Sequence, residues 1–322
     1  MLNQPDKNLL KEFEESLNPS KPEESPIPIR ILGYGEISTV FEITTDSQRG
    51  IAYKRMPLFE NKDEVQKYVA IYEKYNHLLE DAKIFLPKHG AIDVVTDDER
   101  YVLFLFQELI NPDYVCNRLI HSLSADAVLE LVSIVLRNLD RVWAYNRANH
   151  PTIEIAIDGQ ISNFAMEGYN QNNGDIERNT KLTYIDTSTP MYRENGIEVL
   201  DPDLFLKATP PVIRFLLDKL YVGELLSRYY DFRKVAMDLV ANFFKEQKAE
   251  LVPGIIDVVN SFFQEEASIG VNPMSYKEVK KYYSSDARIW NVYLRTRKVH
   301  RFLVQKVLRS YYPFILPVIE QR

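Results

Sequence analysis

Residues 30–109 place five short β-type runs around one amphipathic helix, and this pattern constrains the fold more than any other feature of the sequence. Short apolar and β-branched runs between turns predict strands, whereas apolar residues at intervals of three or four predict a helix. The expected helix covers residues 61–80 and carries Val65, Tyr68 and Tyr72 at such intervals. The expected strands, which complete a β-β-β-α-β-β order, cover residues 30–33, 38–44, 50–56, 91–97 and 101–109.

The sequence on either side of this region has a different character. Residues 1–29 hold a short helical pattern followed by a linker rich in proline and charge. Ser124 is a good N-cap for a long helix over residues 124–148, and a small β cluster follows that helix. From about residue 200 the patterns are mainly helical. We therefore expect an N-terminal helix and linker over 1–29, an N-lobe over 30–109 and a helical C-lobe over 110–322.

Length and charge narrow the class of protein. A chain of 322 residues, 45% of them hydrophobic, is long enough for one large core or two lobes. The net charge of −7, from 39 basic and 46 acidic residues, argues against nucleic acid as the main partner. No apolar run approaches the ~20 residues of a membrane span, and the N-terminus lacks the pattern of a secretory signal. The lone Cys116 excludes an internal disulfide framework, so we expect a soluble cytoplasmic protein.

The N-lobe offers the first half of a candidate phosphoryl-transfer site. Such a site needs a cradle for phosphates, a cation against them, metal ligands, and a carboxylate near the attacking hydroxyl. The run Gly33–Ser38 lies between two expected strands, where glycines let the backbone approach phosphates. Lys54 lies on the next strand, and Glu73 on the following helix could pair with it, with Glu64 as the competing candidate. Taken singly, such a glycine run is more often an ordinary turn, such a lysine an exposed strand residue, and such a glutamate a solvated helix charge.

The small β cluster offers the second half. Asp158 and Asn163 lie in the segment IDGQISN, and Asp186 lies in YIDTS at the end of a further expected strand. These side chains can converge on one edge of the cluster. They would supply a carboxylate for the substrate hydroxyl and two oxygen ligands for Mg²⁺. Asp-Gly and Ser-Asn are also common turn formers. The two segments therefore indicate a phosphoryl-transfer site only when they are considered together with the first half of the site.

In layout these positions resemble the protein-kinase-like superfamily, and within it the branch of aminoglycoside and choline kinases. The short 158–186 region and the ending YIDTS in place of Asp-Phe-Gly are similar to that branch. The stretches GYGEISTVFEI, IAYKRMP and IDGQISN also look similar to an uncharacterised bacterial family of this fold. The resemblance covers about residues 28–190. It implies an α+β, bilobal fold with a small five-stranded antiparallel N-lobe containing one helix, and a larger, mostly helical C-lobe.

The resemblance also implies how the N-lobe would hold a nucleotide. Gly33, Gly35 and Ser38 match the phosphate loop, in which Ser38 replaces the third glycine. Lys54 matches the phosphate-binding lysine, and Glu73 matches the glutamate that pairs with it. The nucleotide-contacting hinge would include Gln107, Glu108 and Leu109.

For the C-lobe, the resemblance implies a catalytic base at Asp158 and ligands of Mg²⁺ at Asn163 and Asp186. The implied cofactors are ATP and Mg²⁺, and the acceptor is an unknown small molecule or protein. Two further departures from the family pattern stand here. Ala156-Ile157 replaces the His-Arg or His-Gly that braces the base, and Thr187-Ser188 replaces Phe-Gly.

The leading hypothesis from the sequence is an ATP- and Mg²⁺-dependent phosphotransferase acting on a hydroxyl. A small-molecule acceptor is favoured because the sequence shows no clear activation segment. Ala156-Ile157 suggests an alternative, a pseudokinase that binds nucleotide or acts as a scaffold. A further alternative is nucleotidyl transfer onto a protein.

Residues 290–309 predict a basic amphipathic helix outside this site. Its cations are Arg295, Arg297, Lys298, Arg301, Lys306 and Arg309, and its opposite stripe is Trp290, Tyr293, Leu294, Phe302 and Leu303. Such a helix could meet a membrane surface or nucleic acid. The commoner arrangement, which we expect here, packs the stripe on the body of the protein and leaves the charges solvated.

Overall fold

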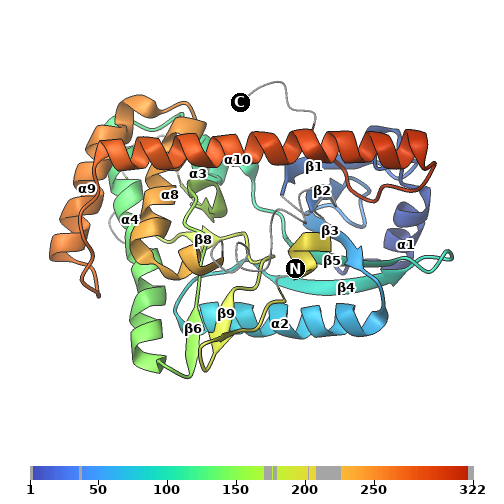
Figure 1. Cartoon of the computed structure of the whole chain (residues 1–322), viewed down its shortest axis with the longest axis horizontal. Coiled ribbons are helices and arrows are strands. Elements are labelled where there is room, and N and C mark those ends of the chain that lie inside the picture. Colours follow the sequence, from blue (N-terminus) through green and yellow to red (C-terminus); the bar gives the residue numbers. More distant parts are fainter. Residues whose placement is uncertain are drawn as a thin grey trace.

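A computed structural model describes residues 3–35, 38–169, 176, 180–201, 203–207 and 226–317. It has a small lobe built on a five-stranded sheet and a larger helical lobe, with one long helix running along both (Figure 1). The α+β architecture expected from the sequence is confirmed.

The N-lobe sheet has the strand order β1-β2-β3-β5-β4, and every neighbouring pair is antiparallel. The single helix between β3 and β4 is α2 (Lys62–Asp81), which Asn61 caps by accepting a hydrogen bond from the Glu64 amide. The five expected strands and the expected helix are all present. The strands are β1 (Ile29–Tyr34), β2 (Thr39–Ile43), β3 (Ile51–Phe59), β4 (His89–Val95) and β5 (Tyr101–Glu108).

The face of the sheet that carries Lys54 is covered by α2. Alternate residues of a strand point to opposite faces, so Met56 of β3 shares this face with Lys54. Met56 packs with Leu103 of β5 and with Tyr68 and Tyr72 of α2 in one buried cluster. This packing fixes α2 directly beside the strand that holds the candidate phosphate-binding lysine.

The opposite face is covered by the N-terminal helix α1 (Lys7–Ser16). Leu10 and Phe13 of α1 are fully buried, and the Phe13 ring lies 4.9 Å from that of Phe41 in β2. Phe104 of β5 closes the same aromatic cluster. The short helical pattern near the N-terminus is therefore an integral part of the N-lobe core.

A buried charge cluster joins α1, β3 and the segment after the last helix. Both oxygens of Glu14 accept hydrogen bonds from Arg55 at 2.6 Å, and both side chains are almost fully buried. Arg100 donates to Glu14 at 2.9 Å, and Arg55 also donates to the Pro313 carbonyl at 2.5 Å. Tyr311 lies under the Arg100 guanidinium at 4.5 Å. These contacts bind the last described segment of the chain to the outside of the N-lobe.

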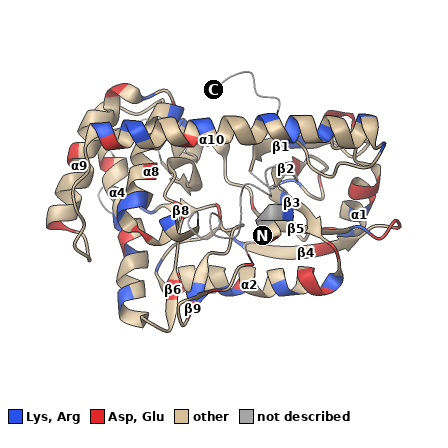
Figure 2. Cartoon of the chain, viewed as in Figure 1, with Lys and Arg blue, Asp and Glu red and all other residues tan. Residues whose placement is uncertain are grey.

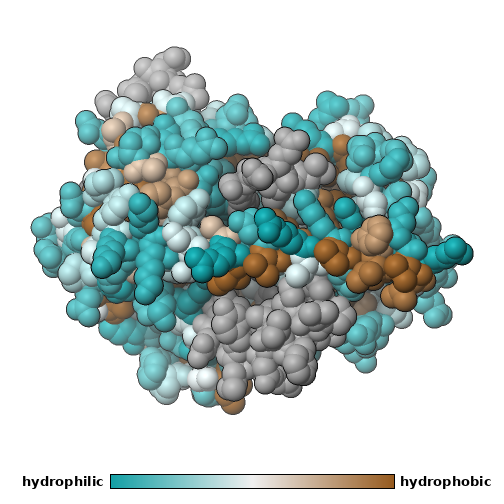
Figure 3. All heavy atoms as spheres, turned by 45° about the horizontal axis from the view of Figure 1, so that its top comes forward, coloured by the Kyte–Doolittle hydropathy of each residue, from teal (hydrophilic) through white to brown (hydrophobic). Residues whose placement is uncertain are grey.

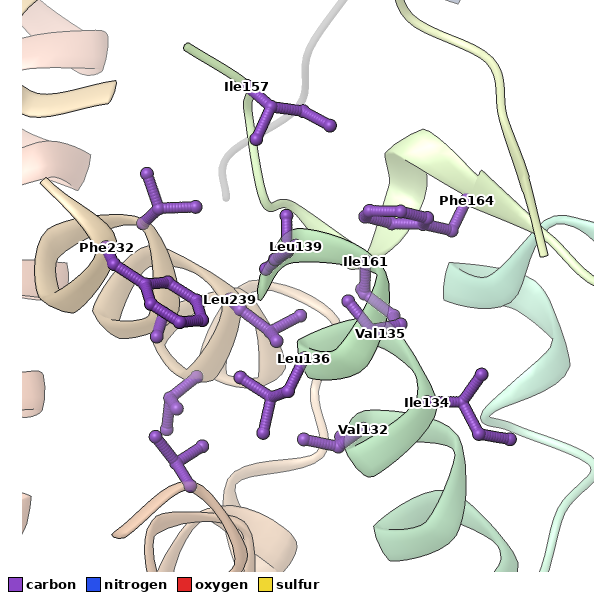
Figure 4. Packing of buried hydrophobic residues seen from close by; sticks show 14 of the residues in the cluster. Val132, Ile134, Val135, Leu136, Leu139, Ile157, Ile161, Phe164, Phe232 and Leu239 are labelled. Carbon is purple, nitrogen blue, oxygen red and sulfur yellow. The ribbon is translucent and has the colours of Figure 1, made fainter. Parts of the chain in front are cut away.

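The C-lobe is built around the long helix α4 (Ala125–Asn149), which Ser124 caps as expected. It packs against α8 (Phe232–Lys245) and α9 (Val252–Glu265), and Figure 4 shows the contact between Leu136 and Leu139 of α4 and Phe232 and Leu239 of α8. The smaller elements are α3 (Cys116–Leu119), β6 (Ile153–Ile155), β7 (Phe164–Ala165), β8 (Thr183–Tyr184), β9 (Tyr192–Glu194), β10 (Ile197–Glu198) and α5 (Asp203–Lys207).

The last helix, α10 (Tyr276–Phe302), lies along one edge of the molecule and reaches from the C-lobe to the N-lobe (Figure 1). Its inner side buries Leu294, as expected for the apolar stripe, but it also buries Arg297, which was expected to be solvated. Phe302 and Leu303 were expected to pack as well, but they are 60% and 45% exposed. The helix therefore has a second apolar side, turned outward.

Candidate active site

The glycine turn between β1 and β2 lies over Lys54. The Gly35 amide donates to the Ser38 carbonyl at 3.0 Å, which closes the turn. A Cβ atom at Gly35 would lie 2.7 Å from Ser38 Oγ, so a side chain there would require the serine hydroxyl to move. Its distance of 3.8 Å from Lys54 Cε would be an ordinary contact, and it shows that the turn lies next to the lysine. Gly33 pairs with Val40 in the strand ladder, and a Cβ there would meet open space. Glu36 and Ile37, the tip of the expected phosphate loop, lie outside the described residues.

Lys54 of the N-lobe contacts two residues of the C-lobe. Its Nζ atom donates to Asp186 Oδ1 at 2.8 Å and also to Ser188 Oγ. Ser188 Oγ lies 2.8 Å from the same Asp186 oxygen, so lysine, aspartate and serine form one closed network. The Lys54 side chain is 17% exposed and that of Asp186 is 40% exposed. The Asp186 carboxylate therefore borders solvent, whereas Lys54 is largely covered.

The electrostatics of this network keep Asp186 ionised. Burial opposes its charge, but the Lys54 ammonium and the hydrogen bonds from Lys54 and Ser188 outweigh burial and lower the pKa of Asp186 below its usual value. All these bonds fall on Oδ1. Among the described residues, nothing donates a hydrogen bond to Asp186 Oδ2. Asp186 Oδ2 is therefore the candidate oxygen for a cation.

A two-stranded hairpin brings Asn163 to Asp186. Phe164 of β7 pairs with Tyr184 of β8, and the Ile185 amide donates to the Asn163 carbonyl at 2.9 Å. Asn163 directly precedes β7, and Asp186 follows Ile185, so the two side chains start from adjacent positions at one end of the hairpin. An amide oxygen and a half-exposed carboxylate suit Mg²⁺, which prefers oxygen ligands and keeps several waters. With the glycine cradle above Lys54, these residues fit a magnesium nucleotide.

Asp158 lies on the loop beside this hairpin. Its Oδ1 accepts from the Gln160 amide at 3.1 Å, and Asn163 Nδ2 lies 3.4 Å from its carbonyl oxygen. Burial raises the pKa of Asp158, and the nearby Asp238 and Asp186 carboxylates raise it further. A carboxylate with a raised pKa is a better proton acceptor than one with an ordinary pKa.

The sequence lacks the polar residues that would brace the Asp158 loop, and apolar packing holds the loop instead. Ala156 and Ile157 are fully buried, and Figure 4 shows Ile157 above Leu139 of α4. Tyr75 of α2 donates to the Ala156 carbonyl at 2.8 Å. A Cβ at Gly159 would lie 2.6 Å from Val235 Cγ1 of α8, so this glycine lets the loop rest directly on that helix.

Comparison with known families decides the membership of this chain. A model described as "Family of unknown function (DUF6206)" matches residues 15–301. The chain belongs to the DUF6206 family. A comparison with curated proteins finds no significant match.

A search of solved structures finds two that are similar to this DUF6206 protein at low sequence identity. One is WaaP in complex with acyl carrier protein, at 14% identity and a TM-score of 0.34, covering 80% of this chain and 98% of that chain. The other is a Stt7 homolog from Micromonas algae soaked with ATP, at 16% identity and a TM-score of 0.38, covering 78% of this chain and 80% of that chain.

The DUF6206 structure does not bring Glu73 to Lys54, contrary to the expectation from the sequence. Glu73 lies on the exposed side of α2, because Tyr72 and Tyr75 turn the opposite side of the helix toward the protein. The competing candidate, Glu64, bonds through both oxygens to Lys207 at 2.9 Å. Lys54 takes Asp186 as its partner instead.

Tyrosines of α2 contact the site where a glutamate was expected. Tyr68 donates to the Ser188 carbonyl at 2.5 Å, and Tyr75 donates to the Ala156 carbonyl. These two tyrosines connect α2 to both site loops. Helical periodicity placed these tyrosines on the apolar face of α2 and so indicated burial, but it carried no signal of their hydroxyl bonds. For Ser188 the available signal was its position two residues after Asp186, which is typical of a side-chain turn.

The hinge residues of this DUF6206 chain use their amides within the N-lobe. The Glu108 amide donates to the Lys88 carbonyl at 2.8 Å, and the Leu109 amide donates to Gly50 at 2.9 Å. Gln107 pairs with His89 in the ladder. A nucleotide base at the hinge would therefore have to use carbonyl oxygens or side chains of these residues rather than the amides of Glu108 and Leu109.

Proposed function

We propose that this protein is an ATP- and Mg²⁺-dependent phosphotransferase that acts on a hydroxyl group, with a small molecule as the favoured acceptor. The observation that carries the proposal is the meeting of Lys54, Asp186 and Ser188 beneath the Gly35 turn, with Asp158 on the adjoining loop. These residues come from separate segments of the chain. Their types and placement match what phosphoryl transfer requires: a cation, an oxygen ligand for metal and a base.

Each of these residues would have a separate role in phosphoryl transfer. Lys54, beneath the Gly35 turn, would hold the phosphates, while Asn163 and Asp186 Oδ2 would hold the metal. Bound Mg²⁺ would supply positive charge against the phosphates. Asp158 would orient the acceptor hydroxyl and accept its proton as the acceptor oxygen bonds to the γ-phosphorus, while the bond from that phosphorus to the bridging oxygen breaks and ADP leaves. The raised pKa of Asp158 suits that role, because the carboxylate then holds the proton more readily.

One observation favours the alternative of a nucleotide-binding protein without turnover. The Lys54 ammonium lies on Asp186 Oδ1 rather than on a helix glutamate, so its positive charge would offset part of the negative charge that the carboxylate offers to a metal at Oδ2. In this second candidate function, the site would bind nucleotide and change the relative position of the two lobes without transferring phosphate.

An assay with labelled ATP distinguishes the phosphotransferase from the nucleotide-binding protein without turnover. We expect the wild-type protein with Mg²⁺ to release label from the γ-phosphate at a slow but measurable rate, with water as the acceptor. Asp158→Asn should lower that rate about 10²–10⁴-fold, the usual contribution of a general base. Glu73→Gln is the matched control and should retain the wild-type rate.

Other outcomes assign other functions. Nucleotide binding without any release or transfer of label, unchanged by Asp158→Asn, would establish the non-catalytic alternative. Label from the α-phosphate on protein side chains would show nucleotidyl transfer. In either case the phosphotransferase proposal would be wrong.

A further inference from the structure

The outer side of α10 and the residues after it carry an unusual concentration of exposed apolar side chains. Seven of the twelve large apolar side chains that are exposed in the described part of the chain lie between positions 289 and 308. Single exposed apolar residues are common on proteins, whereas a contiguous row of them marks an interaction surface. The row, named here the outer stripe, is Ile289, Val292, Val299, Phe302, Leu303, Val307 and Leu308.

The outer stripe follows one side of the helix. Ile289, Val292, Val299 and Leu303 are separated by three, seven and four residues, which keeps them on the same side. They are between 45% and 59% exposed. Figure 3 shows brown side chains gathered along the line of this helix on the face turned to the viewer.

Cations flank the outer stripe and no acidic residue interrupts it. Residues 287–309 contain seven basic and no acidic residues, so this segment contributes +7 to a chain of net charge −7 and the remainder carries −14. Figure 2 shows blue segments along α10, with red confined to its N-terminal part. Arg297 is buried on the inner side. Among the described residues, the structure records no ion pair for the other six cations, Arg288, Arg295, Lys298, Arg301, Lys306 and Arg309.

From this combination we infer that α10 and the residues up to Leu308 form a surface that binds the headgroup region of an anionic lipid bilayer. An apolar row with a basic flank, on a helix at the edge of the molecule, is the arrangement of helices that lie in the plane of a membrane interface. The apolar side chains would enter the boundary of the acyl chains, and the cations would meet lipid phosphates. Within the described chain no helix is long and apolar enough to cross a membrane, so the contact is peripheral.

The charge pattern disfavours the other occupants. A second copy of this helix would place cations against cations, because residues 287–309 offer no acidic partner. Nucleic acid would satisfy the cations but would leave Val299 and Leu303 exposed, since phosphate and base contacts are polar or aromatic. An anionic bilayer satisfies both the charges and the aliphatic side chains.

Sedimentation with lipid vesicles tests the inference independently of any phosphotransferase activity. The full chain should pellet with vesicles of mixed phosphatidylcholine and phosphatidylglycerol, and much less with phosphatidylcholine alone. The bound fraction should fall as salt rises, because ions screen exposed charges. The double variant Val299→Asp/Leu303→Asp and the double variant Arg295→Gln/Lys298→Gln should each weaken binding about tenfold or more.

Matched controls use equally exposed residues elsewhere. Ile197→Asp changes an apolar side chain that is 73% exposed on β10, and Lys67→Gln changes an exposed cation on α2. Both should bind vesicles like the wild type, and all variants should keep the wild-type Tm, which shows that they fold.

Four results would overturn the inference: absence of binding to anionic vesicles, equal binding to neutral ones, unchanged binding by both double variants, or equal losses in the controls. A duplex DNA oligonucleotide that binds more tightly than vesicles would assign the surface to nucleic acid instead. A dimer that dissociates in Val299→Asp/Leu303→Asp would assign it to a second copy.

Discussion

Ser188 adds a hydroxyl contact to the directly bonded pair of Lys54 and Asp186. Its hydroxyl contacts the lysine ammonium and lies 2.8 Å from the Asp186 carboxylate, while its carbonyl accepts from Tyr68. Thr187-Ser188 departs from the sequence pattern of the kinase-like superfamily. In this chain the departure supplies an additional polar contact to the lysine.

We therefore predict that Ser188→Ala loosens the network without abolishing it. Losing one hydroxyl should cost about 1 kcal/mol of stability, the usual net value of a hydrogen bond. A urea titration measures this loss. Thr187→Val, which changes the neighbouring hydroxyl but leaves the Lys54 contact, should weaken magnesium-nucleotide binding less than Ser188→Ala does; the reverse order would contradict the role of Ser188.

Asp158 should destabilise the fold at neutral pH. Its folded-state pKa is raised, so the folded protein binds the proton more tightly than the unfolded chain does. The ionised form is therefore disfavoured in the folded state, and stability is lost as pH rises through the folded pKa. Asp158→Asn should raise the Tm by about 2–4 °C at pH 8.

The gain from Asp158→Asn should shrink as the pH falls toward the ordinary pKa of a carboxyl, because wild-type Asp158 then becomes neutral as well. Melting curves at a series of pH values check this trend. A gain that is independent of pH would show that the raised pKa is not its cause.

At the scale of elements, α2 fixes the site through tyrosine hydroxyls. Tyr75 donates to the loop before Asp158, and Tyr68 donates to the loop after Asp186. One helix of the N-lobe thereby sets the position of both C-lobe loops. A shift of α2 would move Asp158 and Asp186 together.

We predict that Tyr75→Phe lowers turnover while Glu73→Gln does not. The phenylalanine retains the packing but leaves the buried Ala156 carbonyl without its donor, at a cost of about 1–3 kcal/mol. Rates of ATP turnover and urea titrations of both variants provide the measurement. Equal effects of the two substitutions would favour the role first expected for Glu73.

The contrast between Glu73 and the tyrosines shows where prediction from sequence ends. Periodicity predicted α2 and its buried face, since apolar spacing reports directly on which side of a helix is covered. It also predicted the strands and the segments that contain Lys54, Asp158 and Asp186. The partner of Lys54 depends on how two lobes meet, and a contact between residues so far apart in sequence leaves no local pattern.

At the scale of the whole molecule, segments near both ends of the described chain bond to the N-lobe sheet. Glu14 from α1 and the Pro313 carbonyl from the last described segment both bond to Arg55 on β3. The sequence indicated a helix near the N-terminus, yet gave no indication that it would cover the sheet. Buried charges such as Glu14 escape prediction because most glutamates of a surface helix are solvated.

Glu14→Ala should destabilise the protein by about 3–5 kcal/mol, because it leaves the buried Arg55 without its carboxylate. Glu12→Ala is the matched control, since it lies on the exposed side of the same helix and should cost less than about 0.5 kcal/mol. Denaturant unfolding of both variants measures the difference. Similar values for the two would show that the buried ion pair does not hold α1 to the sheet.

The site as a whole is tested most directly by calorimetric titration of ATP with Mg²⁺ into the wild type, Lys54→Met, Asp186→Asn and the control Glu73→Gln. We predict that the wild type and the control bind one nucleotide with equal affinity. Lys54→Met and Asp186→Asn should each bind at least about tenfold more weakly, as expected for the loss of a charged contact. Absence of binding to the wild type, or equal affinity in all four proteins, would contradict a nucleotide site at Lys54 and Asp186.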